Sequence, residues 1–112
     1  MTAPVQVQIL VVPDCPHAAP AAVMVTRLLG ELNPSATDVR TTVVTDAQQA
    51  AALGFAGSPT VLVNGVDPFA GSTDQVGLGC RLYRTPAGLS GLPDADLLRA
   101  ALSAAMTDER AQ

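Results

Sequence analysis

The chain has 112 residues and a formal net charge of −4, and hydrophobic residues make up 48% of it. This length suits one domain, expected to cover residues 1–112. Every basic residue is an arginine and no basic run or aromatic platform occurs, so we expect no nucleic-acid partner. No segment is apolar for long enough to span a membrane and the first residues show no leader-like pattern, so we expect a cytoplasmic protein with no membrane contact.

The first half of the chain predicts two strands, each followed by a helix. Residues 5–12 alternate between apolar and polar and then become continuously apolar, as in a strand that enters a core. After a break at "PDCP", apolar residues recur at helical spacing across 18–31. Residues 38–47 predict the second strand. Asp46 is expected to cap a short alanine-rich helix that ends at Gly54.

The second half predicts a hairpin and a last helix. Residues 60–63 read as a strand, and the Asn-Gly dipeptide at 64–65 predicts a hairpin turn with a return strand from Val66. Residues 70–93 form a long glycine-rich segment that we expect to be a loop, before a helix capped by Asp94. The expected fold is α/β in the order β-α-β-α-β-β-α, with a mixed four-stranded sheet and helices on both faces.

Three local motifs accompany this order of elements. A cysteine, Cys15, lies between the first strand and the first helix, "GSPT" precedes the third strand, and "NG" turns the hairpin. The combination resembles the thioredoxin-like superfamily of thioredoxins and glutaredoxins. More narrowly, "DCPHAAPA", "GSPTVLVNGVDPFA" and "CRLYRTPAGLSGLP" resemble the small DF-family (seleno)proteins over nearly the whole chain. The resemblance implies a redox role for Cys15 and a cis-proline at Pro59 that faces it.

Cys15 is the candidate nucleophile. If the helix begins at Pro16 or His17, the unpaired amides and the positive dipole end of its first turn favour a thiolate at Cys15. Pro16 suits the first helical position because the N–H that it lacks would be unpaired there. The adjacent Asp14 opposes the thiolate, and a protonated His17 would offset Asp14. The alternative is an inert cysteine buried at the end of a strand.

Cys80 is the candidate resolving thiol. The local Cys-x-x-Cys pair of thioredoxins is absent, because Ala18 stands where the second cysteine would be. Cys80 can resolve a mixed disulfide or sulfenic acid on Cys15 if its glycine-rich segment folds back over this end of the sheet. The alternative is a hydrophobic plug beside Leu82.

Substrate contacts are expected around both the cysteine and the proline. In an extended substrate, a backbone group would pair with the backbone of Ser58, which is a form of strand addition. Arg81 and Arg84 either offer positive charge to an anionic thiol or belong to a solvated loop. The candidate substrate-binding residues are Asp14, Pro16, His17, Ser58 and Pro59.

The leading hypothesis is a monomeric thiol–disulfide redox protein that uses Cys15 and Cys80. Its partner would be a disulfide or thiol on a protein or a small molecule such as glutathione. We expect no cofactor, and no metal, because the spacing of two cysteines and one histidine matches no zinc motif. One alternative is a thioredoxin-fold binding module without turnover. Another is capture of a soft metal or an organomercurial by the two thiols, with Asp14 as proton donor.

Overall fold

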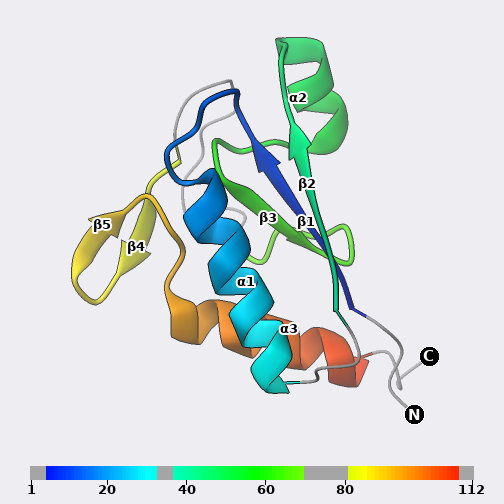
Figure 1. Cartoon of the computed structure of the whole chain (residues 1–112), viewed down its shortest axis with the longest axis vertical. Helices are drawn as coiled ribbons and strands as arrows, with labels where there is room; N and C mark the ends of the chain where they lie inside the picture. The colour runs from blue at the N-terminus through cyan, green and yellow to red at the C-terminus, as the bar shows by residue number, and fades with distance from the viewer. Residues whose placement is uncertain (1–4, 33–36, 70–80, 109–112) are drawn as a thin grey trace.

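A mixed three-stranded sheet forms the centre of the molecule (Figure 1). The computed structural model describes residues 5–32, 37–69 and 81–108. β1 (Val5–Val11) is the middle strand; it pairs in parallel with β2 (Thr37–Val43) and antiparallel with β3 (Thr60–Val63). The parallel pair requires a crossover, and α1 (Ala18–Leu32) provides it, as the sequence predicts.

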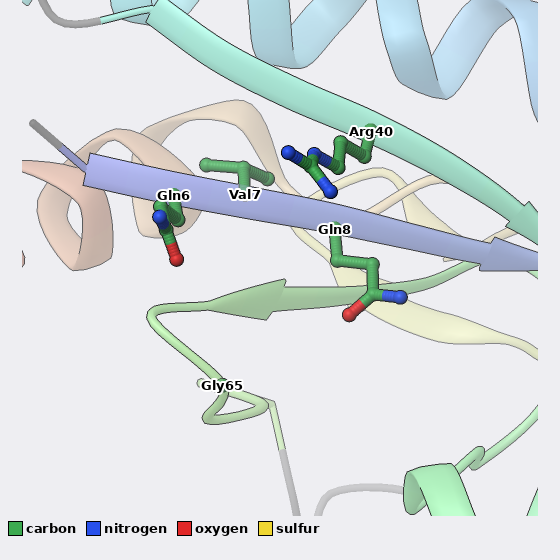
Figure 2. A pocket seen from close by; sticks show the side chains of 5 residues that line it. All are labelled: Gln6, Val7, Gln8, Arg40 and Gly65. Carbon is green, nitrogen blue, oxygen red and sulfur yellow. The ribbon is translucent and has the colours of Figure 1, made fainter.

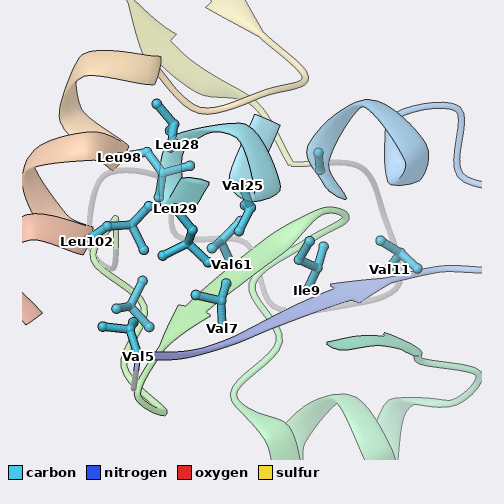
Figure 3. Close-up of a cluster of buried hydrophobic side chains, with 12 residues drawn as sticks. Val5, Val7, Ile9, Val11, Val25, Leu28, Leu29, Val61, Leu98 and Leu102 are labelled. Carbon is cyan, nitrogen blue, oxygen red and sulfur yellow. The ribbon is translucent and has the colours of Figure 1, made fainter. Parts of the chain in front are cut away.

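One face of the sheet packs against α1 and α3 (Ala95–Asp108). The side chains of β1 alternate between the two faces, so its valines and Ile9 point together toward these helices (Figure 3). The helices contribute leucines and a valine at helical spacing. The buried members of this core are Val5, Val7, Ile9, Val11, Ala21, Val25, Leu28, Leu29, Val61, Val63, Leu98 and Leu102.

The opposite face carries a second, smaller core under α2 (Ala47–Leu53). Asp46 caps this helix as predicted, since its carboxylate accepts a hydrogen bond from the Gln49 amide at 2.7 Å. Gly54 ends the helix in the left-handed conformation, with φ of 71°. The buried members are Leu10, Val44, Ala50, Phe55 and Leu62. Helices on both faces of the sheet are therefore confirmed.

The return strand of the predicted hairpin is reduced to a single residue. The turn at 64–65 forms, and Val66 exchanges two backbone hydrogen bonds with Val63, of 2.7 and 3.0 Å. Pairing then stops, because Pro68 has no N–H to donate to a ladder. The Asp67 carboxylate also turns the chain by accepting the Phe69 amide at 2.8 Å. The sheet of the described residues thus has three strands where the sequence predicts four.

Part of the expected loop at 70–93 is regular structure. β4 (Tyr83–Thr85) and β5 (Gly88–Ser90) form an antiparallel hairpin that is separate from the main sheet (Figure 1). Such short strands carry little periodicity, which is why the sequence does not reveal them. Across the described ranges, no helix combines the length and the apolar character needed to cross a membrane.

Candidate functional site

Cys15 and the Ser58–Pro59 bond lie at the same end of the sheet. β1 and β3 are antiparallel with Leu10 opposite Thr60, so the residues that follow β1 lie near those that precede β3. The Val12 amide donates to the Ser58 hydroxyl at 3.1 Å, and the Cys15 amide donates back to the Val12 carbonyl at 3.3 Å. The Ser58–Pro59 peptide bond is cis, as the resemblance implies.

Cys15 is a half-buried free thiol that packs against the edge of the larger core. Its carbonyl accepts the Ala18 amide at 3.2 Å, which closes a turn over Pro16 and His17. The first helical hydrogen bond runs from Ala21 to His17, at 3.0 Å. α1 therefore begins at Ala18 rather than at residue 16 or 17, so Cys15 is not its N-cap. A helix dipole acts mainly within its first turn, and Cys15 lies before that turn.

The neighbours of Cys15 differ in their exposure. Asp14 and Pro16 are exposed, and Asp14 adopts a left-handed backbone with φ of 59°. His17 is half-buried, and its imidazole lies against Gly91 in the segment between β5 and α3. A Cβ atom on Gly91 would lie 2.4 Å from His17 Nε2, so the ring fills the space that a side chain would need. The sequence gives no sign of a role for Gly91, because nothing local links it to His17.

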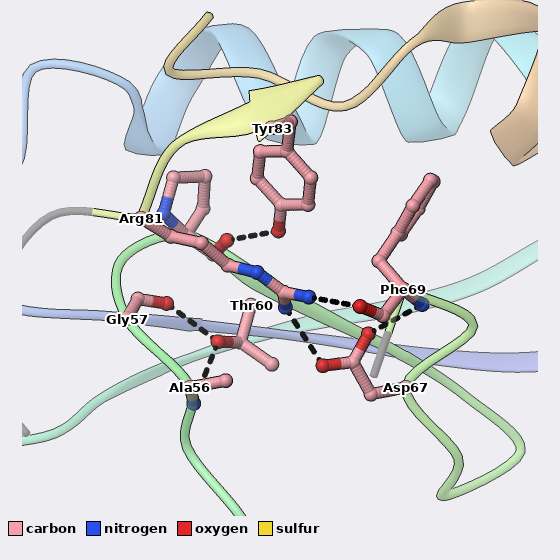
Figure 4. Close-up of polar contacts among 8 residues, drawn as sticks. Ala56, Gly57, Thr60, Asp67, Phe69, Arg81 and Tyr83 are labelled. Carbon is pink, nitrogen blue, oxygen red and sulfur yellow. Dashed lines mark hydrogen bonds and ion pairs between the residues drawn. The ribbon is translucent and has the colours of Figure 1, made fainter. Parts of the chain in front are cut away.

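A buried polar network surrounds Arg81 (Figure 4). The guanidinium donates to the Asp67 carboxylate at 2.7 Å and to the Phe69 carbonyl at 2.8 Å. It also lies over the Tyr83 ring, 4.6 Å from the centroid. Arg81 is only 1% exposed. It is therefore neither a solvated loop residue nor a charge offered to a substrate, which were the two interpretations of the sequence.

Tyr83 joins this network to the proline. Its hydroxyl donates to the Pro59 carbonyl, and its ring meets Phe69 edge to face at 5.2 Å and 81°. Burial raises the pKa of the Tyr83 hydroxyl well above its ordinary value; nearby Asp67 adds to the rise and Arg81 opposes it. The motifs "GSPT" and "DPF" and the residues Arg81 and Tyr83 are thus parts of one packed unit.

The backbone on both sides of Pro59 takes part in hydrogen bonds within the protein. The Arg81 amide donates to the Ser58 carbonyl at 2.9 Å. The Thr60 hydroxyl donates to the Gly57 carbonyl and accepts the Ala56 amide at 3.1 Å (Figure 4). Ser58 and Thr60 are 0% exposed, and Pro59 is buried too. A substrate role for Ser58 and Pro59 stays a prediction.

Two surface grooves lie elsewhere. One, of about 340 Å³, runs between α1 and α3; Val23, Met24 and Leu92 line it, and the exposed Arg99–Glu31 ion pair of 2.6 Å borders it. The other lies where Gln6 and Gln8 point away from the larger core, beside Arg40 of β2 (Figure 2). Cys15 lines neither groove.

The remaining sequence expectations concern a second thiol and metals. Cys80 lies outside the described residues, so its role as a resolving or mercury-binding partner stays a prediction. Within 5–32, 37–69 and 81–108, no cluster of three histidine, cysteine or acidic side chains could hold a metal ion. No protein-family model, curated protein or solved structure matches the chain.

Proposed function

We propose that the protein is a thioredoxin-like thiol–disulfide redox protein with Cys15 as its nucleophile. The observation that carries the proposal is a free, half-buried thiol in the turn after the central strand. The backbone amide of Cys15 donates to the Val12 carbonyl, and the Val12 amide donates to the hydroxyl of Ser58, the residue before Pro59. The parallel β1–β2 pair, the antiparallel β3 and helices on both faces are compatible with a thioredoxin-like topology.

The chemistry proposed is thiol–disulfide exchange. The Cys15 thiolate attacks one sulfur of a disulfide, a new S–S bond forms at Cys15, and the other sulfur leaves as a thiolate that takes a proton from water. A second thiolate then attacks the mixed disulfide. If Cys80 supplies it, a Cys15–Cys80 disulfide forms and an external thiol such as glutathione must reduce it. If an external thiol instead attacks the substrate-derived sulfur of the mixed disulfide, Cys15 leaves as a thiolate and is regenerated in that step.

The exposure of the neighbouring residues supports access to the thiol. Asp14 and Pro16 are exposed on either side of Cys15, so a reagent approaching from solvent meets them first. On its inner side, Cys15 packs against the larger core. A reducing compartment such as the cytoplasm would keep Cys15 in its thiol form.

Alkylation kinetics test the nucleophile. The chain has two cysteines, so Cys15→Ser and Cys80→Ser each leave a single thiol. We expect Cys15 in the Cys80→Ser variant to react with iodoacetamide at pH 7 faster than a cysteine in an unstructured peptide does. A rate equal to or below that of the peptide would contradict the proposal.

Mass spectrometry tests the resolving thiol separately. After mild peroxide treatment and non-reducing digestion, we expect a peptide pair that links Cys15 to Cys80. If Cys15 instead accumulates as a mixed disulfide with added glutathione and no linked pair appears, Cys80 is not the resolving residue. In that case the external thiol completes the reaction.

A further inference from the structure

We propose that the site at Cys15 takes low-molecular-weight disulfides and excludes extended polypeptides, because the chain's own Arg81 already occupies the strand position beside Ser58. This inference rests on the proposed redox function of Cys15, and it specifies the substrate class of that site.

Strand addition needs a backbone edge with free hydrogen-bonding groups. At Ser58 the carbonyl accepts the Arg81 amide at 2.9 Å, and the side-chain hydroxyl accepts the Val12 amide. Ser58 is 0% exposed and Pro59 is buried. An incoming peptide would therefore find the Ser58 carbonyl already paired and the residue covered.

The contact between Arg81 and Gly57 leaves no room for a second strand. A Cβ atom built on Gly57 would lie 2.8 Å from Arg81 Cβ and 3.1 Å from Arg81 Cα. The two segments thus approach more closely than any side chain at residue 57 would permit, and Gly57 has a φ of 114° that other residues rarely adopt. The polypeptide that lies against this corner belongs to the folded protein itself.

Arg81 is also held too firmly for a peptide to displace it easily. Displacement would separate the guanidinium from the Asp67 carboxylate and from the Phe69 carbonyl, and would take it off the Tyr83 ring (Figure 4). Breaking a buried ion pair is costly, because each charge is left without a partner away from water. We expect this cost to slow reaction with an extended peptide by about 100-fold or more relative to a small disulfide.

A small disulfide can react without pairing to the backbone of Ser58. It approaches Cys15 across the exposed Asp14 and Pro16 and needs no hydrogen bond from Ser58. The Cys15 thiolate displaces one half of the disulfide as a thiolate, which takes a proton from water, and the other half remains on Cys15. A small thiol then attacks the sulfur of the half that Cys15 carries. Cys15 leaves as a thiolate, and a new small disulfide forms.

The experiment compares two substrates of the Cys80→Ser protein, which keeps Cys15 as its single thiol. One is bis(2-hydroxyethyl) disulfide. The other is an unstructured ten-residue peptide whose central cysteine carries 2-mercaptoethanol as a mixed disulfide. Intact-mass spectrometry follows the formation of the mixed disulfide on Cys15. Each rate is divided by the rate at which free glutathione reacts with the same substrate, so that the two substrates can be compared. We expect the normalised rate for the peptide to be about 100-fold lower.

Asp67→Asn in the same background removes the charge that anchors Arg81. We expect it to raise the normalised peptide rate by about tenfold or more and to leave the rate of the small disulfide unchanged. Glu31→Gln is the matched control, because it removes the exposed ion pair with Arg99 and should change neither rate. Equal normalised rates for the two substrates before the substitution would overturn the inference while leaving the redox function standing.

Failure of the redox function would look different, since neither substrate would react with Cys15. If circular dichroism shows that the Asp67→Asn variant does not fold, a second measurement is used. It follows hydrogen exchange of the Arg81 amide in the Cys80→Ser protein. We expect this amide to stay protected while excess peptide is present. Loss of its protection on addition of the peptide would show that Arg81 yields its position, and would overturn the inference.

Discussion

Arg81 Nη1 lies 2.7 Å from Asp67 Oδ2, with the arginine side chain fully buried and the aspartate side chain 9% exposed. Taking both charges out of water is unfavourable, and the pair persists because other partners complete it. The Phe69 carbonyl accepts a second guanidinium hydrogen bond and the Tyr83 ring faces the cation. The pair fixes Arg81 where its amide reaches Ser58, so it connects the stability of the fold to the state of the candidate site.

Asp67→Asn should therefore destabilise the protein strongly. The substitution keeps the shape of the side chain but leaves a buried guanidinium without its counter-charge, and we expect a loss of about 3–5 kcal/mol in the free energy of unfolding. Glu31→Gln removes the exposed ion pair with Arg99 and should cost about 0–1 kcal/mol. Urea denaturation of both variants checks this. Equal losses would show that Arg81 and Asp67 are solvated in solution.

The elements of the fold were largely predictable, because their signals are local. The alternation in 5–12, the helical spacing in 18–31 and the cap at Asp46 each depend on residues close together in the sequence. The sequence predicts a longer return strand than the structure contains. An Asn-Gly turn predicts a reversal of the chain, but it does not predict how far the pairing continues. Pro68 ends the pairing after Val66, and it could have been read as a limit to the strand.

The surroundings of the site were less predictable. Cys15 and the cis bond at Pro59 follow from motifs, but the ion pair of Arg81 joins residues 14 positions apart in different motifs. One signal was available: Arg81 lies between a cysteine and "LY", in a segment more apolar than a solvated loop requires. The contact between His17 and Gly91 had no such signal, because it depends on where the chain after β5 meets the residues before α1.

Two adjacent leucines of α3 should differ sharply in their contribution to stability. Leu98 is 0% exposed in the larger core, whereas Leu97 is 56% exposed. Leu98→Ala should cost about 2–5 kcal/mol through lost burial and the cavity that it leaves. Leu97→Ala should fall within about 0.5 kcal/mol of the parent protein. Thermal or urea denaturation measures both, and similar values would mean that α3 does not dock on β1 as described.

Two glycine-to-alanine substitutions should have opposite signs. Gly30 lies in the helical conformation within α1, and a Cβ atom there would meet nothing within 4 Å. Gly30→Ala should therefore stabilise the protein by about 0.5–1 kcal/mol. Gly54 has a φ of 71° at the end of α2, so Gly54→Ala should destabilise it by about 1–2 kcal/mol. Denaturation in urea would contradict this if both changes had the same sign.

Stability should fall steeply at alkaline pH because of Tyr83. Burial raises the pKa of its hydroxyl above the ordinary value of 10.0, so the unfolded chain releases this proton first as the pH rises. The unfolded state then binds fewer protons than the folded state. The contribution of Tyr83 is therefore fully present below about pH 10 and is lost above it, at up to about 1.4 kcal/mol per pH unit.

The composition allows the ionisation of Tyr83 to be followed directly by absorbance. Tyr83 is the single tyrosine and the sequence contains no lysine, so tyrosinate absorbance near 295 nm reports on Tyr83 alone. We expect this absorbance to appear together with unfolding rather than before it. In Tyr83→Phe, which retains the ring but loses the hydrogen bond to Pro59, the free energy of unfolding should be lower at neutral pH and nearly flat between pH 10 and 11. A folded protein that shows tyrosinate absorbance at pH 10.5 would contradict the buried position of this hydroxyl.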